Sequence, residues 1–266
     1  MRFLFVGDIV GSPGVSAVRS IVPSLRRSES LDFVVANAEN ATGGSGCSPK
    51  DYRLIRSAGV DAVTMGDHIY KKYELSDVMK LPDEPIAKPA NFPPEAPGSD
   101  RIRLMIAGTG VAILSLLGRT YMRPVDCPFR AADRVLASLD PSVTVRIVDV
   151  HAEATADKYL LLHHLKGRVS AVLGTHTHVP TADEHILDGT AFVCDAGMTG
   201  PYRSILGRRV DRVLSTAITF MPSAFDVATE DVRLSGVIVD VDPSTGRATA
   251  IRRVHVPAAV VPIPAA

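Results

Sequence analysis

The sequence of 266 residues has no tryptophan, 5% aromatic residues and three cysteines, Cys47, Cys127 and Cys194. So few aromatic rings disfavour a long platform on which nucleic-acid bases could stack. Three widely spaced cysteines without a CxxC pair disfavour a disulfide framework or a four-cysteine zinc site, and they fit a reducing compartment. No apolar run approaches the roughly 20 residues that a membrane-spanning helix needs.

The sequence also lacks net charge, because 29 Lys and Arg balance 29 Asp and Glu. It therefore offers no overall attraction to nucleic acid or to an anionic membrane. The first residues enter an apolar strand pattern, Phe3–Val6, too early for a signal peptide. We expect a cytoplasmic protein with no membrane contact and no extended surface for nucleic acid.

The sequence does contain a repeated order of apolar strand, polar loop and helix. Apolar runs at Phe3–Val6, Phe33–Ala36 and Ala62–Met65 each end in a polar loop. Ser-Pro pairs at 12–13 and 48–49 are typical helix starts. This order is typical of a parallel sheet in an α/β fold. We predict one domain at 1–256 and a Pro/Ala-rich tail at 257–266.

Further elements follow from the same patterns. We expect a proline-rich loop around Ile86–Ala87, and antiparallel strands from Ala191 onward with a turn at 242–246. The other predicted strands lie at 102–106, 111–116, 143–148, 169–173, 191–194, 212–220, 232–242 and 248–256, and the predicted helices at 15–25, 49–58, 131–139 and 155–165.

Residues 174–178 read GTHTH and follow the apolar run 169–173. Residues i and i+2 of an extended chain point to the same side, so His176 and His178 could present two imidazoles together. Their Cα atoms would lie roughly 6.5 to 7 Å apart. That span suits ligands of two metal ions whose centres lie roughly 3.5 to 4 Å apart. The alternative for an isolated pair is two surface histidines in a polar loop.

Polar side chains stand at five predicted strand ends: Asp8, Glu39 with Asn40, Asp67 with His68, His151, and His176 with His178. Ligands of α/β proteins collect beyond the carboxyl ends of the strands. Oxygen and imidazole donors without thiolate suit Mn, Fe, Zn or similar divalent ions. Taken singly, Asp8 could be a helix-start anion, Asn40 a loop cap, Asp67 a turn residue and His151 a core histidine. Their joint occurrence predicts a site, and the surplus of donors favours two metals with Glu39 as the bridge.

The order GD, AEN, GDH, HAE and GTHTH resembles the calcineurin-like metallophosphoesterases. Within them it resembles the bacterial YmdB-like branch of 2′,3′-cyclic-nucleotide phosphodiesterases. Longer segments resemble that branch as well, at 88–93, 117–122, 149–155, 174–184 and 195–202. The resemblance covers nearly the whole chain except the tail.

This resemblance implies a four-layer α/β/β/α sandwich with two mixed β-sheets, and a two-metal site on one rim. It implies two divalent or mixed-valence ions, Fe or Mn in preference and Zn also compatible, and it is consistent with a homo-oligomer. The implied roles are a first metal held by Asp8, Asn40 and His178, a second held by Asp67, His151 and His176, a bridge at Glu39 and a proton donor at His68. The family usually has Asn where this chain has Asp67. The added charge should bind the second metal more tightly and weaken its Lewis acidity.

These features predict a dinuclear-metal phosphodiesterase acting on small cyclic nucleotides, with 2′,3′-cyclic substrates favoured. Hydroxide formed at the two cations would attack phosphorus, and His68 would protonate the leaving ribose oxygen. One alternative is a broad phosphomonoesterase. Another is a low-activity or non-catalytic regulatory protein that binds a nucleotide or an RNA-processing partner, which Asp67 keeps open. The expected partner is a small phosphoester substrate.

Overall fold

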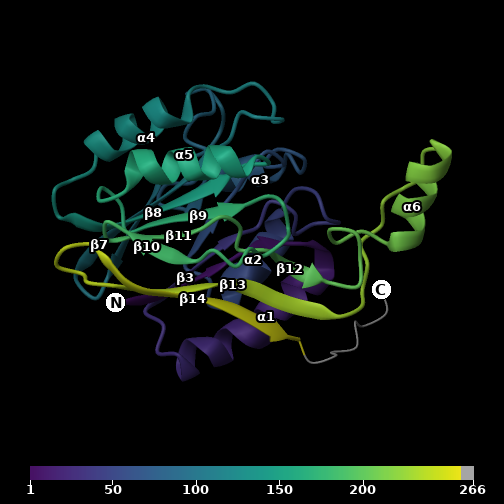
Figure 1. Ribbon diagram of the computed structural model, residues 1–266, viewed down its shortest axis with the longest axis horizontal. Coiled ribbons are helices and arrows are strands. Elements are labelled where there is room, and N and C mark those ends of the chain that lie inside the picture. The colour runs from purple at the N-terminus through teal and green to yellow at the C-terminus, as the bar shows by residue number, and fades with distance from the viewer. Residues whose placement is uncertain (259–266) are drawn as a thin grey trace.

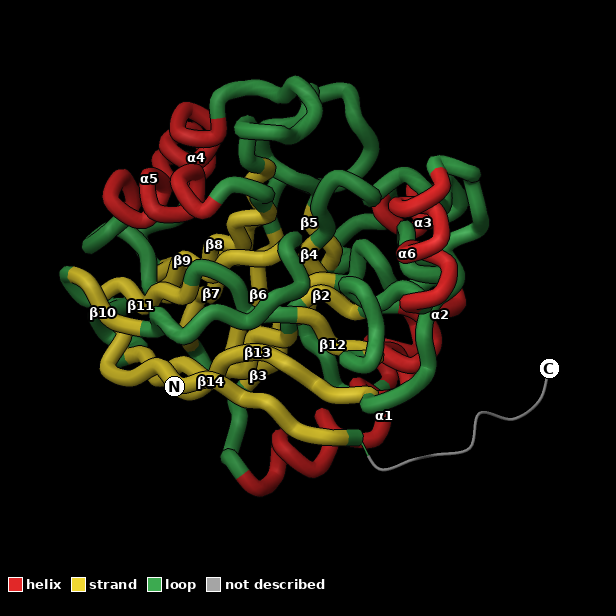
Figure 2. The backbone as a smooth tube through the Cα atoms, turned by 45° about the vertical axis from the view of Figure 1, so that its right-hand side comes forward, coloured by secondary structure: helices red, strands yellow, loops and turns green. Residues whose placement is uncertain are grey.

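The computed structural model describes residues 1–258, which form two β-sheets packed face to face between two layers of helices (Figures 1 and 2). The first sheet has the order β2-β12-β13-β1-β3-β4-β5, with β14 paired to β13, and the second has the order β10-β11-β9-β8-β7-β6. The strands of the first sheet are β1 (Arg2–Val6), β2 (Asp8–Ile9), β3 (Phe33–Asn37), β4 (Ala62–Thr64), β5 (Ile86–Ala87), β12 (Met198–Pro201), β13 (Val232–Val241) and β14 (Ala248–Pro257).

The second sheet and the helices complete the sandwich. The strands of the second sheet are β6 (Ile102–Ile106), β7 (Thr109–Leu117), β8 (Val143–His151), β9 (Ala171–Thr175), β10 (His185–Leu187) and β11 (Thr190–Val193). The helices are α1 (Gly11–Ser28), α2 (Pro49–Ser57), α3 (Leu75–Met79), α4 (Pro128–Ala137), α5 (Thr155–Leu165) and α6 (Val210–Thr219).

The layers follow from the alternation of side chains along the buried strands. Phe3 and Phe5 of β1 pack between the sheets, in one apolar cluster with Val145 of β8. Leu4 and Val6 point to the other face, into a cluster that includes residues of α1 and α2. A third cluster joins α4 and α5 to the outer face of the second sheet. Both sheets contain parallel and antiparallel pairs, so the expected four-layer sandwich with two mixed sheets is confirmed.

Two predictions for the second half of the chain are wrong. Residues 212–220, predicted as a strand, lie mostly in α6, which projects from the sandwich in Figure 1. A strand needs a neighbour for its backbone hydrogen bonds, whereas a helix forms them internally, so a segment that leaves both sheets is better satisfied as a helix. The strand predicted at 191–194 exists as β11, but it pairs parallel to β9 and antiparallel only to β10.

The predicted tail overlaps the end of the first sheet. Pro257 still pairs with Arg233 across β13 and β14, whereas residues 259–266 of the tail lie outside the described residues. The single domain at 1–256 stays a prediction. Within residues 1–258, no helix is long and apolar enough to cross a membrane.

Candidate metal centre

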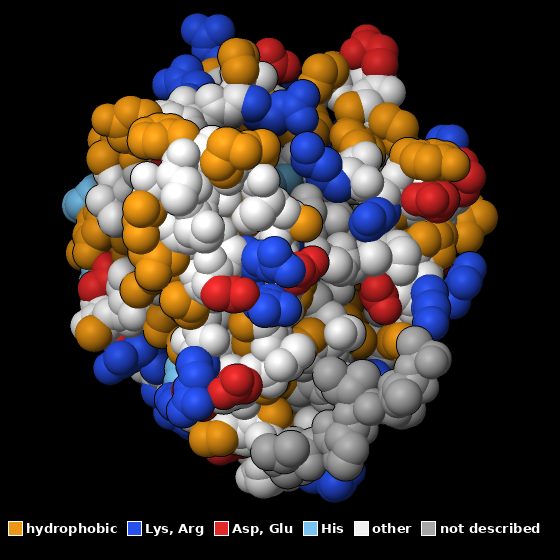
Figure 3. Space-filling view, turned by 90° about the vertical axis from the view of Figure 1, so that its right-hand side faces the viewer, with side chains coloured by type: hydrophobic (Ala, Val, Ile, Leu, Met, Phe, Trp, Pro, Cys, Tyr) orange, Lys and Arg blue, Asp and Glu red, His pale blue; other side chains and the backbone are white. Residues whose placement is uncertain are grey.

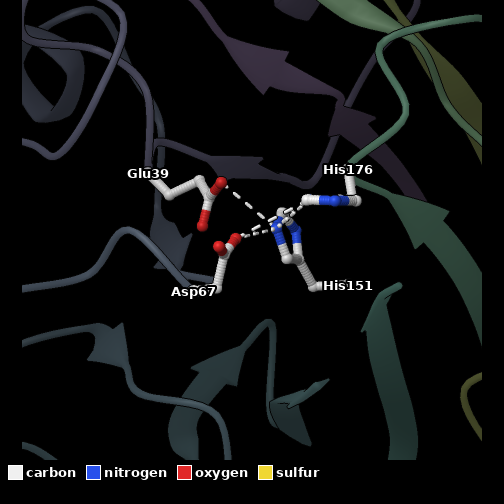
Figure 4. A group of neighbouring side chains, drawn as sticks. All are labelled: Glu39, Asp67, His151 and His176. Atoms are coloured by element: carbon white, nitrogen blue, oxygen red, sulfur yellow. Dashed lines mark hydrogen bonds and ion pairs between the residues drawn. The ribbon is translucent and has the colours of Figure 1, made fainter. Parts of the chain in front are cut away.

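The carboxyl ends of strands from both sheets bring the predicted ligands to one rim. Asp8 in β2, Glu39 after β3 and Asp67 after β4 come from the first sheet. His151 ends β8 and His176 follows β9 in the second sheet. In Figure 4 the side chains of Glu39, Asp67, His151 and His176 point toward one another, and one donor atom from each lies within 4.8 Å of the others. Four donors this close could share one cation.

His151 and His176 direct ring nitrogens at each other and at three carboxylates. His151 Nε2 lies 3.1 Å from Glu39 Oε1 and 3.2 Å from Asp67 Oδ1. His176 Nδ1 lies 3.0 Å from His151 Nε2, while its Nε2 contacts Glu153 Oε2 at 3.1 Å. Imidazole that binds a metal through one nitrogen typically has its other nitrogen held by a carboxylate or another acceptor. His176 with Glu153 has this arrangement.

A buried polar network holds the ring of His151 from behind. Thr175 Oγ1 lies 2.9 Å from His151 Nδ1 and donates to Asp149 Oδ1 at 2.7 Å. Thr64 and Asn37 donate to the other oxygen of Asp149 at 2.6 and 3.0 Å. Sequence reasoning missed this network, although an aspartate within the apolar strand VTVRIVDVH was a usable signal. The network leaves Nε2 of His151 for the centre.

The residues assigned to the first metal also reach this rim. His178 Nδ1 donates to the carbonyl oxygen of Leu206 at 3.0 Å, and its Nε2 lies 3.3 Å from Asn40 Nδ2. Asp8 Oδ2 accepts from the backbone amide of His176 at 3.0 Å. Asp8 Oδ1 is buried and has no hydrogen-bond partner among residues 1–258. A buried carboxylate oxygen in this state is costly unless a cation or a proton meets it, so the donor set fits a metal.

His68 lies at the same rim, and its imidazole is more exposed than those of His176 and His151. Its side chain is 31% exposed, against 20% for His176 and 0% for His151. The His68 amide donates to Glu39 Oε2 at 3.1 Å, and its Nδ1 lies 2.8 Å from Asn40 Oδ1. His68 Nδ1 also lies 3.3 Å from Glu39 Oε1. This side-chain contact raises the pKa of His68, against the opposing effect of burial.

The backbone of the two-histidine segment differs from the extended form assumed in the i, i+2 argument. β9 ends at Thr175, and His176 and His178 have φ angles of +98° and +66°. Residues other than glycine rarely adopt these left-handed backbone angles. Where they do, the strained backbone is often at a functional site. The two rings therefore reach the rim through a tight bend rather than through strand alternation.

Burial and mutual contacts shift the pKa values of the cluster. Burial raises the pKa of Asp8 to about 6. Burial and the charge of His151 lower the pKa of His176 to about 4, which favours the neutral imidazole that a metal needs. Burial would raise the pKa of Glu39, but the charges and hydrogen bonds of His151 and His68 outweigh it and lower the pKa well below its usual range.

The family model described as YmdB-like protein matches residues 4–254. This chain belongs to the YmdB-like family. The matched segment contains every predicted ligand, from Asp8 to His178.

YmdB-like relatives share nearly the whole length of the chain. It is 42% identical over 256 residues to the 2′,3′-cyclic-nucleotide 2′-phosphodiesterase of Bacillus subtilis strain 168, covering 96% of each protein. A hypothetical protein from Thermus thermophilus has a TM-score of 0.91 at 41% identity, covering 97% of this chain and 99% of that one. A novel phosphatase from Mycoplasma pneumoniae has a TM-score of 0.90 at 29% identity, covering 97% and 93%. The expected metallophosphoesterase family is confirmed, and the chain is a hydrolase of the phosphodiesterase class.

Proposed function

We propose that this YmdB-like enzyme is a dinuclear-metal phosphodiesterase that hydrolyses small cyclic nucleotides, with 2′,3′-cyclic nucleotides preferred. The observation that carries the proposal is the convergence of Glu39, Asp67, His151 and His176 within 4.8 Å. The unpaired buried oxygen of Asp8, which has no partner among residues 1–258, adds to it. The name of the Bacillus subtilis relative supports the substrate class.

Two cations suit the donor set because it exceeds what one ion needs. The proposed ligands are Asp67, His151 and His176 for one ion, Asp8, Asn40 and His178 for the other, and Glu39 for both. Asn40 directs its oxygen toward His68, so its amide would have to turn by half a rotation to bind through oxygen. Oxygen and imidazole donors without thiolate suit Fe, Mn or Zn, and the family resemblance favours Fe or Mn. When bound, the ions would supply Lewis acidity toward phosphoryl oxygens and a water of lowered pKa near neutral pH.

His68 supplies the proton for the leaving group in this proposal. Its Nδ1 lies 2.8 Å from Asn40 Oδ1 and 3.3 Å from Glu39 Oε1, so this nitrogen faces the side chains of the centre whichever way the Asn40 amide is turned. The other nitrogen, Nε2, has Asp67 Oδ2 at 3.8 Å, which is beyond hydrogen-bond distance. Nε2 is therefore the atom that can give its proton to the ribose oxygen as the bond from that oxygen to phosphorus breaks. General acid catalysis of this kind typically contributes about 10²–10⁴-fold in rate.

Elemental analysis of the purified protein, paired with hydrolysis of adenosine 2′,3′-cyclic phosphate, tests the proposal. We expect about two metal ions per chain, as a dinuclear site requires. His68→Ala should keep that metal content and lose about 10²–10⁴-fold in turnover. His185→Ala is a matched control, because His185 is bound to the Asp183 carbonyl and is not among the predicted ligands.

Other outcomes select the alternatives. One metal or none, with no turnover after Mn²⁺ or Fe²⁺ is supplied, would favour a regulatory binding protein. Faster hydrolysis of p-nitrophenyl phosphate than of the cyclic nucleotide would favour a broad phosphomonoesterase. In either case Asp67→Asn shows whether the added carboxylate is responsible, because this substitution restores the residue expected from the family resemblance.

A further inference from the structure

A buried ion pair close to the two-histidine bend takes no part in the chemistry proposed above. Lys158 of α5 donates from Nζ to Asp195 Oδ2 at 2.8 Å. The two side chains are 0% and 1% exposed. Lysine and aspartate are rarely buried so completely, because each loses its hydration. The other contacts of the Asp195 carboxylate indicate what the pair does.

Asp195 holds the residue that lies between His176 and His178. Its Oδ2 accepts from the backbone amide of Thr177 at 3.0 Å and from Thr177 Oγ1 at 2.8 Å. Its Oδ1 accepts from the amide of Gly197 at 2.8 Å. One carboxylate therefore ties the midpoint of the bend to the segment that follows β11.

The bend needs such a tie because both flanking histidines have left-handed backbone conformations. Residues with a Cβ persist in that region only where the surrounding structure enforces it. Without the two bonds at Thr177, the segment could relax toward an extended form. The ring directions of His176 and His178 would then change with it.

Gly174 lets the three segments approach closely. A Cβ at Gly174 would lie 1.7 Å from the Cys194 carbonyl oxygen and 2.9 Å from Lys158 Cδ. The Gly174 carbonyl also accepts from the Ala196 amide at 2.8 Å. Strand β9, helix α5 and the segment after β11 thus meet directly before the bend, with no room for a larger residue at 174.

We propose that Asp195 and Lys158 are positioning residues of the metal centre. Asp195 holds the His176–His178 bend in the form that presents both rings, and Lys158 neutralises the carboxylate that does so. The charge balance matters because the Asp195 carboxylate is 1% exposed, and a buried charge without a partner is strongly destabilising. The inference rests on the proposed dinuclear site.

Asp195→Asn tests the inference, because it keeps the size of the side chain and removes its charge and one acceptor oxygen. Mn²⁺ binding to metal-free protein is measured by calorimetry, and bound metal is counted by elemental analysis. We expect Mn²⁺ affinity to fall by roughly 10- to 100-fold, as for other groups that support metal ligands. Thr177→Val removes the hydroxyl bond to Asp195 at 2.8 Å, together with a longer one from the Val179 amide at 3.4 Å, and keeps the amide bond to Asp195. It should lower the affinity by a smaller factor. It also tests the inference if Asp195→Asn does not fold.

Asp183→Asn is the matched control. Asp183 accepts from Thr181 Oγ1, Tyr159 Oη and the Cys194 amide at 2.6, 2.7 and 3.1 Å, and none of these donors belongs to the bend. It should lower the thermal midpoint without changing Mn²⁺ affinity. Wild-type affinity in folded Asp195→Asn or Thr177→Val would overturn the inference alone. A wild-type protein that binds no Mn²⁺ would overturn the proposed function together with it.

Discussion

Helices α5 and α6 have similar lengths, 11 and 10 residues, but lie in opposite surroundings. α5 covers the second sheet and buries Lys158 and Leu161, whereas α6 buries no residue and projects from the sandwich (Figure 1). α6 is nevertheless the more amphipathic helix, with Val210, Leu214 and Ile218 on one face at 43%, 50% and 69% exposure. An amphipathic pattern shows which face a helix could bury, and the fold decides whether a covering surface exists.

The two helices also relate differently to the metal centre. α5 sends Lys158 to the carboxylate that holds the two-histidine bend. The segment before α6 contacts the centre through Leu206, whose carbonyl oxygen accepts a hydrogen bond from His178 Nδ1. Figure 3 shows the side of the molecule toward which α6 projects, where apolar side chains lie among charged ones. We therefore expect substitutions in α5 to change stability strongly and those in α6 to change it little.

The largest effect should come from breaking the buried pair of α5. Lys158→Met leaves the Asp195 charge buried and unpaired, which should cost about 3–5 kcal/mol of unfolding free energy in urea denaturation. Lys166→Met is the matched control, since Lys166 pairs with Asp188 at 2.9 Å with side chains 36% and 58% exposed. This exposed pair should contribute far less than the buried one, because solvent screens its charges. Equal losses of unfolding free energy in Lys158→Met and Lys166→Met would contradict the expected difference between the buried and the exposed pair.

Replacing one leucine in each helix compares the contributions of α5 and α6 to stability without changing any charge. Leu161 in α5 is 0% exposed and Leu214 in α6 is 50% exposed. Leu161→Ala should cost about 2–5 kcal/mol because it leaves a cavity in the core under α5. Leu214→Ala should stay within about 0.5 kcal/mol. A cost above about 1 kcal/mol for Leu214→Ala, measured by denaturation, would mean that α6 is covered in solution.

The smallest effect concerns the exposed pair at the start of α6. The hydrogen bond from Arg209 lowers the pKa of Asp211. A lowered carboxyl pKa gives stability that is present above the unfolded pKa of about 3.9 and lost as the pH falls through the folded pKa. Solvent and salt screen this pair, so Asp211→Asn should leave the urea midpoint unchanged at pH 7 and at pH 3. A loss at pH 7 that disappears at pH 3 would show that the pair contributes.

The fold and the rim were largely predictable because buried strands carry a strong local signal. Apolar runs with polar residues at their ends mark both the strands and the edge where ligands collect, so the sequence alone predicts that His151 stands at a strand end. The prediction of a strand at 212–220 was wrong because the local sequence pattern does not show that this segment leaves both sheets. The bend at His176 was missed because left-handed backbone has no reliable signal outside glycine.

The sequence by itself determined which donors stand at the strand ends and the order of the elements, because both follow from the periods of strand and helix and from the chemistry of each side chain. Only the tertiary structure decided that Asp8 and His176, which are 168 residues apart, would meet at 3.0 Å. It also decided that Lys158 would be buried beside Asp195. Such contacts join distant segments, and they depend on how two sheets and a helix pack, which no local pattern encodes.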